Sequence, residues 1–251
     1  MNYWKNKEER AQKAISHTEN MNNKYKKEIE NSTKQTKVYN KEVAIEKCNK
    51  KMQIEVVDMD SVTAVLNYAE SGKKCAVLNF ASYKNPGGMF YNGSSAQEES
   101  LCHESYLYNV LREKQTFYDW NNQHKNRALY TNRALYTPEI LFERDEKTVK
   151  CDVITCAAPN KNAAQKYQNV SDDENNGYLK NRIKFVLDIA ANENVDILIL
   201  GAYGCGVFGQ DPKLVSRYFN EYLTDHPYFE RVIFAIPAGP NLQVFETEFR
   251  K

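Results

Sequence analysis

Residues 75–100 read CAVLNFASYKNPGGMFYNGSSAQEES, and they combine three features in a fixed order. Residues 75–81 form a short, nearly continuous apolar run, which is typical of a strand covered on both faces. A glycine-bearing loop follows at residues 86–93, and a helix is expected from about Ala96 to Glu113. Together they predict a buried strand, a turn and a helix, the repeating unit of an α/β sandwich.

The same unit occurs again further along the chain. Residues 195–200, VDILIL, are expected to form a second buried strand, and Gly201–Gly209 is a second glycine-rich loop. A helix then begins at Pro212, with Asp211 as its N-cap. The other expected elements follow the usual periodicities: strands at 52–57, 149–157 and 231–236, a helix capped by Ser61 and ended by Gly72, and a helix at 177–192. This alternation predicts a largely parallel or mixed sheet between helices.

The first 51 residues differ in character from the rest of the chain. They hold 13 Lys and Arg against 7 Glu, and residues 7–34 have only a thin apolar stripe. We expect one or two exposed helices that lie on a domain formed by residues 52–251, or a partly loose arm. A basic arm could contact an anionic polymer, although a solvated helical face is the simpler interpretation. The net charge of the whole chain is +1 and gives no case for nucleic-acid binding.

Composition narrows the class of protein further. With 251 residues and 41% hydrophobic content, the chain can bury the core of one large domain or two small ones. No apolar run approaches the roughly 20 residues of a membrane helix, and the N-terminus lacks a signal-peptide core. The six cysteines form no CxxC pair and no zinc-finger spacing, so we expect reduced thiols in a cytoplasmic protein. They are Cys48, Cys75, Cys102, Cys151, Cys156 and Cys205.

Both glycine loops are candidates for binding phosphate. Glycine lets backbone N–H groups approach a ligand, and the helix that follows each loop offers unpaired N–H donors at its N-terminus. Two such loops at the carboxyl ends of strands suit a ligand with two linked phosphates, and the alternative is that the glycines only form turns. Gly204, Gly206 and Gly209 also match the dinucleotide fingerprint. That fold needs an acidic residue after the next strand, whereas Glu230 precedes it.

The first loop is followed by Gln97, Glu98 and Glu99. Ser95 and Glu98 have the spacing of a capping box, which would give Glu98 a structural role at the helix N-terminus. Alternatively, two adjacent carboxylates beside a sugar can donate a proton and orient the substrate for glycosidic cleavage. A Cys205 nucleophile is a weaker alternative, because no histidine is placed to activate the thiol.

A short repeat stands between these units. Residues 126–131 read NRALYT, and residues 132–137 read NRALYT again. One such copy is far shorter than the units of repeat proteins. We expect a small duplication within a loop.

Several of these residues resemble one family, the microbial poly(ADP-ribose) glycohydrolases, which have the macrodomain fold. The resemblance starts with Asn79-Phe80-Ala81-Ser82, Asn85-Pro86-Gly87-Gly88 and Ala96-Gln97-Glu98-Glu99-Ser100. Further blocks follow in order: Leu135–Pro138 leading to Phe142-x-Arg144-Asp145, Ala158–Asn160, Gly204–Gly209 and Phe234–Pro237. It runs from about Val56 to Phe249, and residues 1–51 look like the helical extension that such bacterial proteins carry. It implies a macrodomain-like three-layer α/β/α sandwich with a mixed central sheet.

The resemblance also implies roles for individual residues. Glu99 would be the catalytic acid, Glu98 would hold the scissile ribose, and Gln97 would help to position the catalytic loop. The other implied substrate-binding residues lie in the two loops or at the end of the first strand: Asn79, Ser82, Gly87, Gly88, Met89, Gly204, Cys205, Gly206, Val207 and Phe208. The implied reaction is hydrolysis of the ribose–ribose bond of poly(ADP-ribose), which releases ADP-ribose, and no metal or redox cofactor is implied.

One position departs from the family pattern. The third glycine of the signature is Met89 here, and its side chain would crowd the place where backbone should approach phosphate and ribose. Hydrolysis remains the favoured reading, and the alternatives are a macrodomain that binds ADP-ribose without turnover and a hydrolase of mono-ADP-ribosyl proteins. ADP-ribosylated proteins would then be partners, and we expect a monomer.

Overall fold

The computed structural model describes residues 3–45, 48, 50–69 and 72–250, and it confirms the expected sandwich around a mixed sheet. Seven strands form one sheet in the order β1-β4-β5-β3-β6-β7-β2. β4 runs antiparallel to both of its neighbours, and the other neighbouring strands are parallel. The strands are β1 Lys37–Tyr39, β2 Gln53–Val57, β3 Cys75–Phe80, β4 Ala134–Arg144, β5 Lys147–Cys156, β6 Ile197–Leu200 and β7 Arg231–Ala235.

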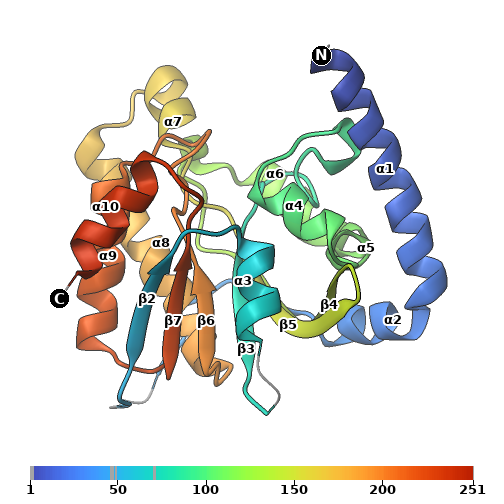
Figure 1. Ribbon diagram of the computed structural model, residues 1–251. Coiled ribbons are helices and arrows are strands. Elements are labelled where there is room, and N and C mark those ends of the chain that lie inside the picture. The colour runs from blue at the N-terminus through green and yellow to red at the C-terminus, as the bar shows by residue number, and fades with distance from the viewer. Residues whose placement is uncertain (1–2, 46–47, 49, 70–71, 251) are drawn as a thin grey trace.

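Helices cover both faces of the sheet (Figure 1). The α-helices are α1 Tyr3–Lys24, α2 Lys26–Gln35, α3 Ser61–Tyr68, α4 Gln97–His103, α5 Leu107–Leu111, α6 Gln115–Gln123, α7 Lys161–Gln168, α8 Asp172–Asn192, α9 Pro212–Asp225 and α10 Pro240–Phe249. Single 3₁₀ turns are η1 Phe90–Asn92, η2 Arg112–Lys114 and η3 Asn126–Ala128. α8, α9 and α10 pack on one face, and α3, α4 and α5 lie on the other.

The central strand β3 explains the continuous apolar run. Cys75 and Val77 point into the core on the α3–α4 face, whereas Ala76 and Leu78 point into the core beneath α8 and α9. Side chains of a strand alternate between faces, so a strand with a core on each side needs apolar residues at every position. β3 is also parallel to β6, with Cys75 opposite Ile197. The two glycine loops therefore leave the sheet at the same edge.

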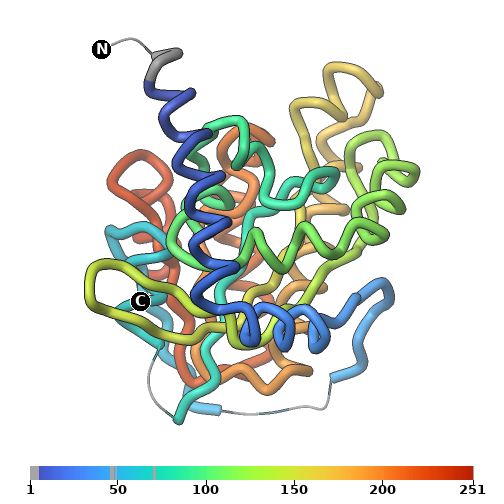
Figure 2. Tube along the Cα trace, turned by 90° about the vertical axis from the view of Figure 1, so that its right-hand side faces the viewer, coloured from blue at the N-terminus to red at the C-terminus, as the bar shows by residue number. Residues whose placement is uncertain are grey.

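The N-terminal segment forms the two expected helices, and α1 runs along the outside of the domain (Figures 1 and 2). The segment then adds β1 to the sheet, where Lys37 pairs with Tyr136. Residues 1–51 thus contribute a strand as well as helices. The division of the chain at residues 51 and 52 stays a prediction.

The prediction of one helix over residues 96–113 is wrong, because the helix ends with α4 and a separate helix, α5, follows. Glu104 leaves the helix and its carbonyl accepts a hydrogen bond from Glu143 N at 2.8 Å, and Ser105 forms an isolated bridge to Phe142. The chain therefore pairs with the edge of β4 before α5 begins. Sequence periodicity misses this break because the competing partner lies about 40 residues away.

Two other expectations need correction. Asp60 and not Ser61 caps α3, since its carboxylate accepts bonds from the N–H groups of Val62 and Thr63 at 2.9 Å. α3 ends at Tyr68, before Gly72. The hexapeptide repeat is also not confined to a loop. Its first copy enters the turn η3 and its second copy enters β4, so the sheet decides the conformation of identical residues.

Candidate active site

A cavity of about 540 Å³ lies at the carboxyl ends of β3 and β6. Five segments contribute to its walls: the loop after β3, the N-terminus of α4, the residues after η3, the residues after β5 and the loop after β6. Its lining residues are Phe80, Ala81, Ser82, Tyr83, Lys84, Met89, Ser94, Ala96, Gln97, Glu98, Glu99, Tyr130, Ala158, Asn160, Ala202, Tyr203, Gly204, Gly206, Val207 and Phe208.

Most of the residues expected from the sequence meet in this cavity. Four of them stand behind it and do not line it: Asn79, Gly87, Gly88 and Cys205. The sequence analysis predicted Phe208 but missed Tyr83 and Tyr130, which stack with ring centroids 4.1 Å apart. Phe208 lies beside Tyr130 and completes an aromatic wall. Tyr130 belongs to the hexapeptide repeat, and nothing in the sequence marked it as a site residue. Its φ is 61°.

Glu98 is held by the end of β3 and the residues after it. The amide of Asn79 donates to its Oε1 at 3.2 Å, and the backbone N–H of Ser82 donates to its Oε2 at 2.7 Å. The side chain of Glu98 is only 3% exposed, and Asn79 is fully buried. Asn79 therefore orients the Glu98 carboxyl group.

Glu99 contacts the glycine loop directly. Its Oε1 accepts a hydrogen bond from Met89 N at 2.9 Å, and its Oε2 accepts one from Ala96 N at 3.1 Å. The capping box expected between Ser95 and Glu98 is therefore wrong. α4 begins one residue later than that pattern requires, so Glu99 takes the N3 position and closes the helix start.

Gln97 fixes the start of α4 to the central strand. Its Oε1 accepts from Phe80 N at 2.9 Å, and its Nε2 donates to Leu78 O at 2.9 Å and to Ser61 Oγ at 3.1 Å. Because these bonds satisfy the whole amide, α4 can start at only one position relative to β3. The two glutamates that follow Gln97 are thereby aimed at the cavity.

Gly88 lies against both acids. Its φ is 63°, and a Cβ at this position would lie 2.6 Å from Glu99 Oε1 and 2.9 Å from Glu98 Oε2. Glycine is therefore required at position 88 for two reasons: the backbone is left-handed, and the two carboxyl groups leave no space for a Cβ. Met89 needs no glycine for its backbone, because its φ is −111°. Its side chain lines the cavity and is about half exposed.

The loop after β6 forms the opposite wall. Gly204 has a φ of 75°, and a Cβ there would meet Ala158 and Gln210 at 2.9 Å. Asn162 anchors the tip of the loop, since its Nδ2 donates to Val207 O at 3.0 Å and its backbone N–H donates to Phe208 O at 3.1 Å. A fixed loop with Val207 and Phe208 at its tip therefore faces the acid pair.

The thiol of Cys205 does not suit nucleophilic catalysis. Burial raises the pKa of Cys205 to about 12, so the group is protonated at neutral pH. The thiolate is the nucleophilic form of cysteine. The structure therefore gives no support to the Cys205 alternative.

The acid pair keeps a proton at neutral pH. Burial raises the pKa of Glu98 from 4.5 to about 8, and the neighbouring Glu99 acts in the same direction, whereas the bonds from Ser82 and Asn79 act against it. Two carboxyl groups in one dry site resist double ionisation. Glu98 therefore holds a proton at neutral pH, beside the carboxyl group of Glu99.

This pKa gives a prediction for stability. Between pH 4.5 and about 8 folded Glu98 holds a proton that the unfolded chain has lost, so the free energy of unfolding falls as pH rises through this range. Glu98→Gln should raise the Tm by about 5–10 °C at pH 8 and by only about 1–2 °C at pH 5. Calorimetric melting at both pH values measures this. Glu113→Gln, at an exposed site, is the control, and equal gains at the two pH values would contradict the account.

A second prediction concerns Met89. Met89→Gly should raise kcat/KM for poly(ADP-ribose) by a factor of about 3 to 10, because it removes a flexible side chain from the cavity wall. Steady-state kinetics of the variant against the unaltered protein tests this. An unchanged kcat/KM would show that the methionine points away from the bound substrate.

A smaller cavity, of about 410 Å³, adjoins the first across shared walls. Phe80, Ala96, Gln97 and Ala202 line both cavities. On its far side the second cavity is bordered by the start of α3 and by residues 235–241 after β7. The two cavities therefore lie side by side at the carboxyl edge of the sheet, and together they are called the groove below.

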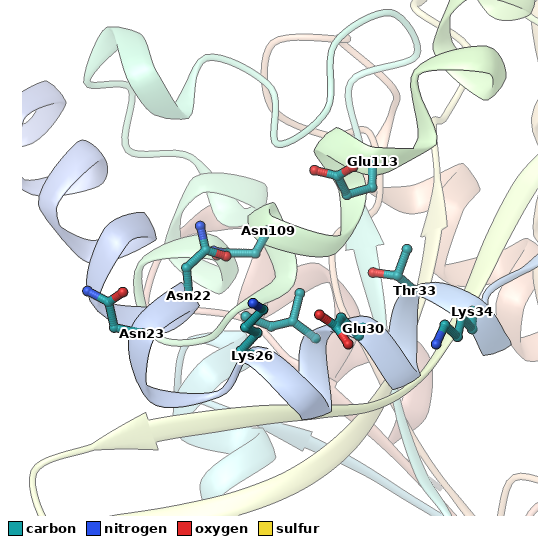
Figure 3. Close-up of a pocket in the computed structure, with 9 residues that line it drawn as sticks. Asn22, Asn23, Lys26, Glu30, Thr33, Lys34, Asn109 and Glu113 are labelled. Carbon is teal, nitrogen blue, oxygen red and sulfur yellow. The ribbon is translucent and has the colours of Figure 1, made fainter.

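Another hollow, of about 530 Å³, lies between the α1–α2 pair and α5 (Figure 3). Polar side chains line it, among them Asn22, Lys26, Glu30 and Asn109. It shares no lining residue with the groove. It is therefore separate from the candidate active site.

Two further searches cover the described part of the chain only. Within residues 3–45, 48, 50–69 and 72–250, no group of three or more His, Cys, Asp or Glu side chains is placed to hold a metal ion. Over the same ranges, none of the helices has both the length and the apolar composition needed to cross a bilayer.

Comparisons with known proteins agree with this geometry. The family described as "Microbial-type PARG, catalytic domain" matches residues 7–145. The solved poly(ADP-ribose) glycohydrolase of Thermomonospora curvata is 28% identical, with a TM-score of 0.86 over 96% of this chain and 99% of that chain. The structure of the same enzyme bound to the inhibitor ADP-HPD is 27% identical, with a TM-score of 0.84 and the same coverage of both chains. The Deinococcus radiodurans enzyme in complex with ADP-ribose is 31% identical, with a TM-score of 0.79 over 88% of this chain and 97% of that chain. No curated protein matches the sequence.

The fold and the site define a macrodomain-like protein with a pair of carboxyl groups in its ligand groove. The chain belongs to the microbial-type poly(ADP-ribose) glycohydrolase family, whose match covers more than half of its length.

Proposed function

We propose that this protein hydrolyses the ribose–ribose O-glycosidic bond of poly(ADP-ribose) and releases ADP-ribose, with Glu99 as the general acid. The observation that carries the proposal is the pair of buried glutamates that lines a groove between two glycine loops. Such bonds break through an oxocarbenium-like state, in which the leaving oxygen needs a proton and the ring needs negative charge nearby. Two adjacent carboxyl groups can supply both when one of them is protonated and the other is ionised.

The two glutamates would have different roles in the reaction. Glu99 stands at the helix start beside Met89 and would protonate the leaving oxygen. Glu98, fixed by Asn79 and Ser82, would hold the hydroxyls of the scissile ribose. Water then attacks the anomeric carbon.

The groove suits a ligand with two ends joined by a diphosphate. We propose that the distal ribose lies in the larger cavity and that the diphosphate lies between the Gly87–Met89 and Gly204–Phe208 loops. The adenosine end would occupy the adjoining cavity. Among the described residues that line this second cavity, Phe80 is the one aromatic residue, so it is the candidate for stacking on adenine.

Chromatography of poly(ADP-ribose) after incubation with the protein tests the proposal. Shortened chains and free ADP-ribose are the expected products. Intact chains that stay bound to the protein would favour the binding module, and release of single ADP-ribose units from modified proteins alone would favour the mono-ADP-ribosyl hydrolase. Location in the cytoplasm, the monomeric state and ADP-ribosylated proteins as partners stay predictions.

The dependence of rate on pH gives a further prediction. Bound substrate covers the acid pair, in which burial already raises the pKa of Glu98, and it brings two phosphates nearby. Burial and negative charge both favour the protonated form of a carboxyl group. The pH at which activity falls through loss of this proton should therefore be higher in kcat than in kcat/KM. Full pH–rate profiles of both constants measure it, and coincident profiles would contradict the assignment.

A further inference from the structure

Helix α1 packs directly on the glycine loop that carries Met89. Arg10 Nε donates a hydrogen bond to Gly93 O at 2.7 Å, although 83 residues separate the two. Gly93 has a φ of 73°, and a Cβ there would lie 2.0 Å from Lys7 O and 3.2 Å from Ala11 N. The backbone of the loop therefore touches the backbone of α1, with no space for a side chain between them.

The loop also inserts a side chain between α1 and α4. Phe90 is 1% exposed, and its ring packs edge-on against His103 with centroids 4.5 Å apart. The ring of His17, on α1, lies on another side of Phe90 with centroids 6.5 Å apart. His17 Nε2 is also bonded to Ser105 O at 2.8 Å. α1 thus holds the loop and the segment after α4 together.

Short backbone bonds connect this contact to the proposed acid. Ser94 N donates to Met89 O at 3.2 Å, and Gly93 N donates to Phe90 O at 3.0 Å. At the other end of the same turn, Met89 N donates to Glu99 Oε1 at 2.9 Å. Residues 89–94 form one compact turn, so a displacement at Gly93 moves the donor that Glu99 uses.

We propose that α1 is a positioning element for catalysis and that Arg10 is a positioning residue, which acts through Gly93 and Met89 on Glu99. The inference rests on the proposed role of Glu99 as the acid. Among the described residues of α1, none lines either cavity of the groove, so we infer that α1 acts on the loop and not on the ligand. The family match itself begins at residue 7, within α1.

The effect should fall much more on turnover than on binding, because the Gly87–Met89 loop is only one of the segments proposed to hold ADP-ribose. A displacement of about 1 Å at a reacting group can lower a rate by about 100-fold. The second glycine loop and the adjoining cavity would be unchanged, so ADP-ribose could still bind to them. A helix that merely stabilises the fold would instead lower the Tm and leave kcat of the folded protein intact.

Arg10→Ala tests this separation. We expect kcat for poly(ADP-ribose) to fall by about tenfold or more, while the Kd for ADP-ribose stays within about twofold. Hydrogen exchange in the peptide covering residues 86–95 should become faster. Arg10→Lys keeps a donor for Gly93 O and should recover part of kcat. Lys13→Ala removes a positive charge one turn away on α1, at an exposed position, and should leave all three measurements unchanged.

Gly93→Ala disrupts the same contact from the side of the loop. The molecules of this variant that fold should show the same loss of kcat as Arg10→Ala. The proposal is overturned if Arg10→Ala lowers the Tm but leaves kcat and loop exchange as in the unaltered protein. It is also overturned if Lys13→Ala has the same effect as Arg10→Ala. If the unaltered protein releases no ADP-ribose, the proposed function fails, and exchange in the loop still reports on the α1 contact.

Discussion

Glu99→Gln is expected to lower the rate of ADP-ribose release from poly(ADP-ribose) by about a thousandfold. A glutamine has the shape of the acid but has no proton to give to the leaving oxygen, and general acid catalysis contributes about 10² to 10⁴ to a rate. The affinity for ADP-ribose should change little, because the phosphates and the adenosine end are held elsewhere in the groove. Single-turnover kinetics and titration calorimetry on the same sample measure the two quantities.

The control for this variant is Glu104→Gln. Glu104 follows α4 in the same segment and pairs with Arg144, outside the groove. Its substitution should leave the rate of release as it is. Loss of ADP-ribose binding in Glu99→Gln would mean that Glu99 is structural, a role that its bonds to Met89 and Ala96 would also allow.

Gly88→Ala is expected to lower turnover by at least about 100-fold. The added Cβ would stand 2.6 Å from Glu99 Oε1 and 2.9 Å from Glu98 Oε2, so either the acids or the loop must move. Displaced reacting groups account for a loss of this size. The left-handed backbone of residue 88 adds a stability cost of about 1–2 kcal/mol. Kinetics with poly(ADP-ribose) and thermal melting together measure both effects.

Gly72→Ala separates the clash from the backbone strain. Gly72 also has a left-handed backbone, with a φ of 83°, but a Cβ there meets no atom of the described residues within 4 Å. We expect a similar loss of stability and normal turnover. Equal turnover in Gly72→Ala and Gly88→Ala would show that the space beside the acids is not needed.

The buried strands could be predicted because their signal is local. β3 and β6 have a core on each face, so their apolar residues are continuous. β4 gave no such signal. Its register shifts between Thr137 and Ile140, where Glu139 has a φ of 57°. Its partner β5 follows directly in a hairpin, whereas its other partner, β1, is distant in sequence. β1 has only three residues, and its conformation follows from pairing with β4.

Part of the site could also be predicted, because its motif residues lie close together in the sequence. Family resemblance placed Glu98 and Glu99 beside the first glycine loop, and the structure puts both in the groove. The start of α4 could not be placed to one residue, because it depends on the bonds of Gln97 to β3. The contact of Arg10 with Gly93 joins residues 83 positions apart, and no periodicity in the sequence records it.

The most direct test of the account is a crystal structure of the protein with ADP-ribose bound. We expect the oxygen on the anomeric carbon of the distal ribose to lie about 3 Å from a carboxyl oxygen of Glu99. The diphosphate should lie between the Gly87–Met89 and Gly204–Phe208 loops. A distal ribose bound away from both glutamates, or ADP-ribose seated outside this groove, would contradict the account.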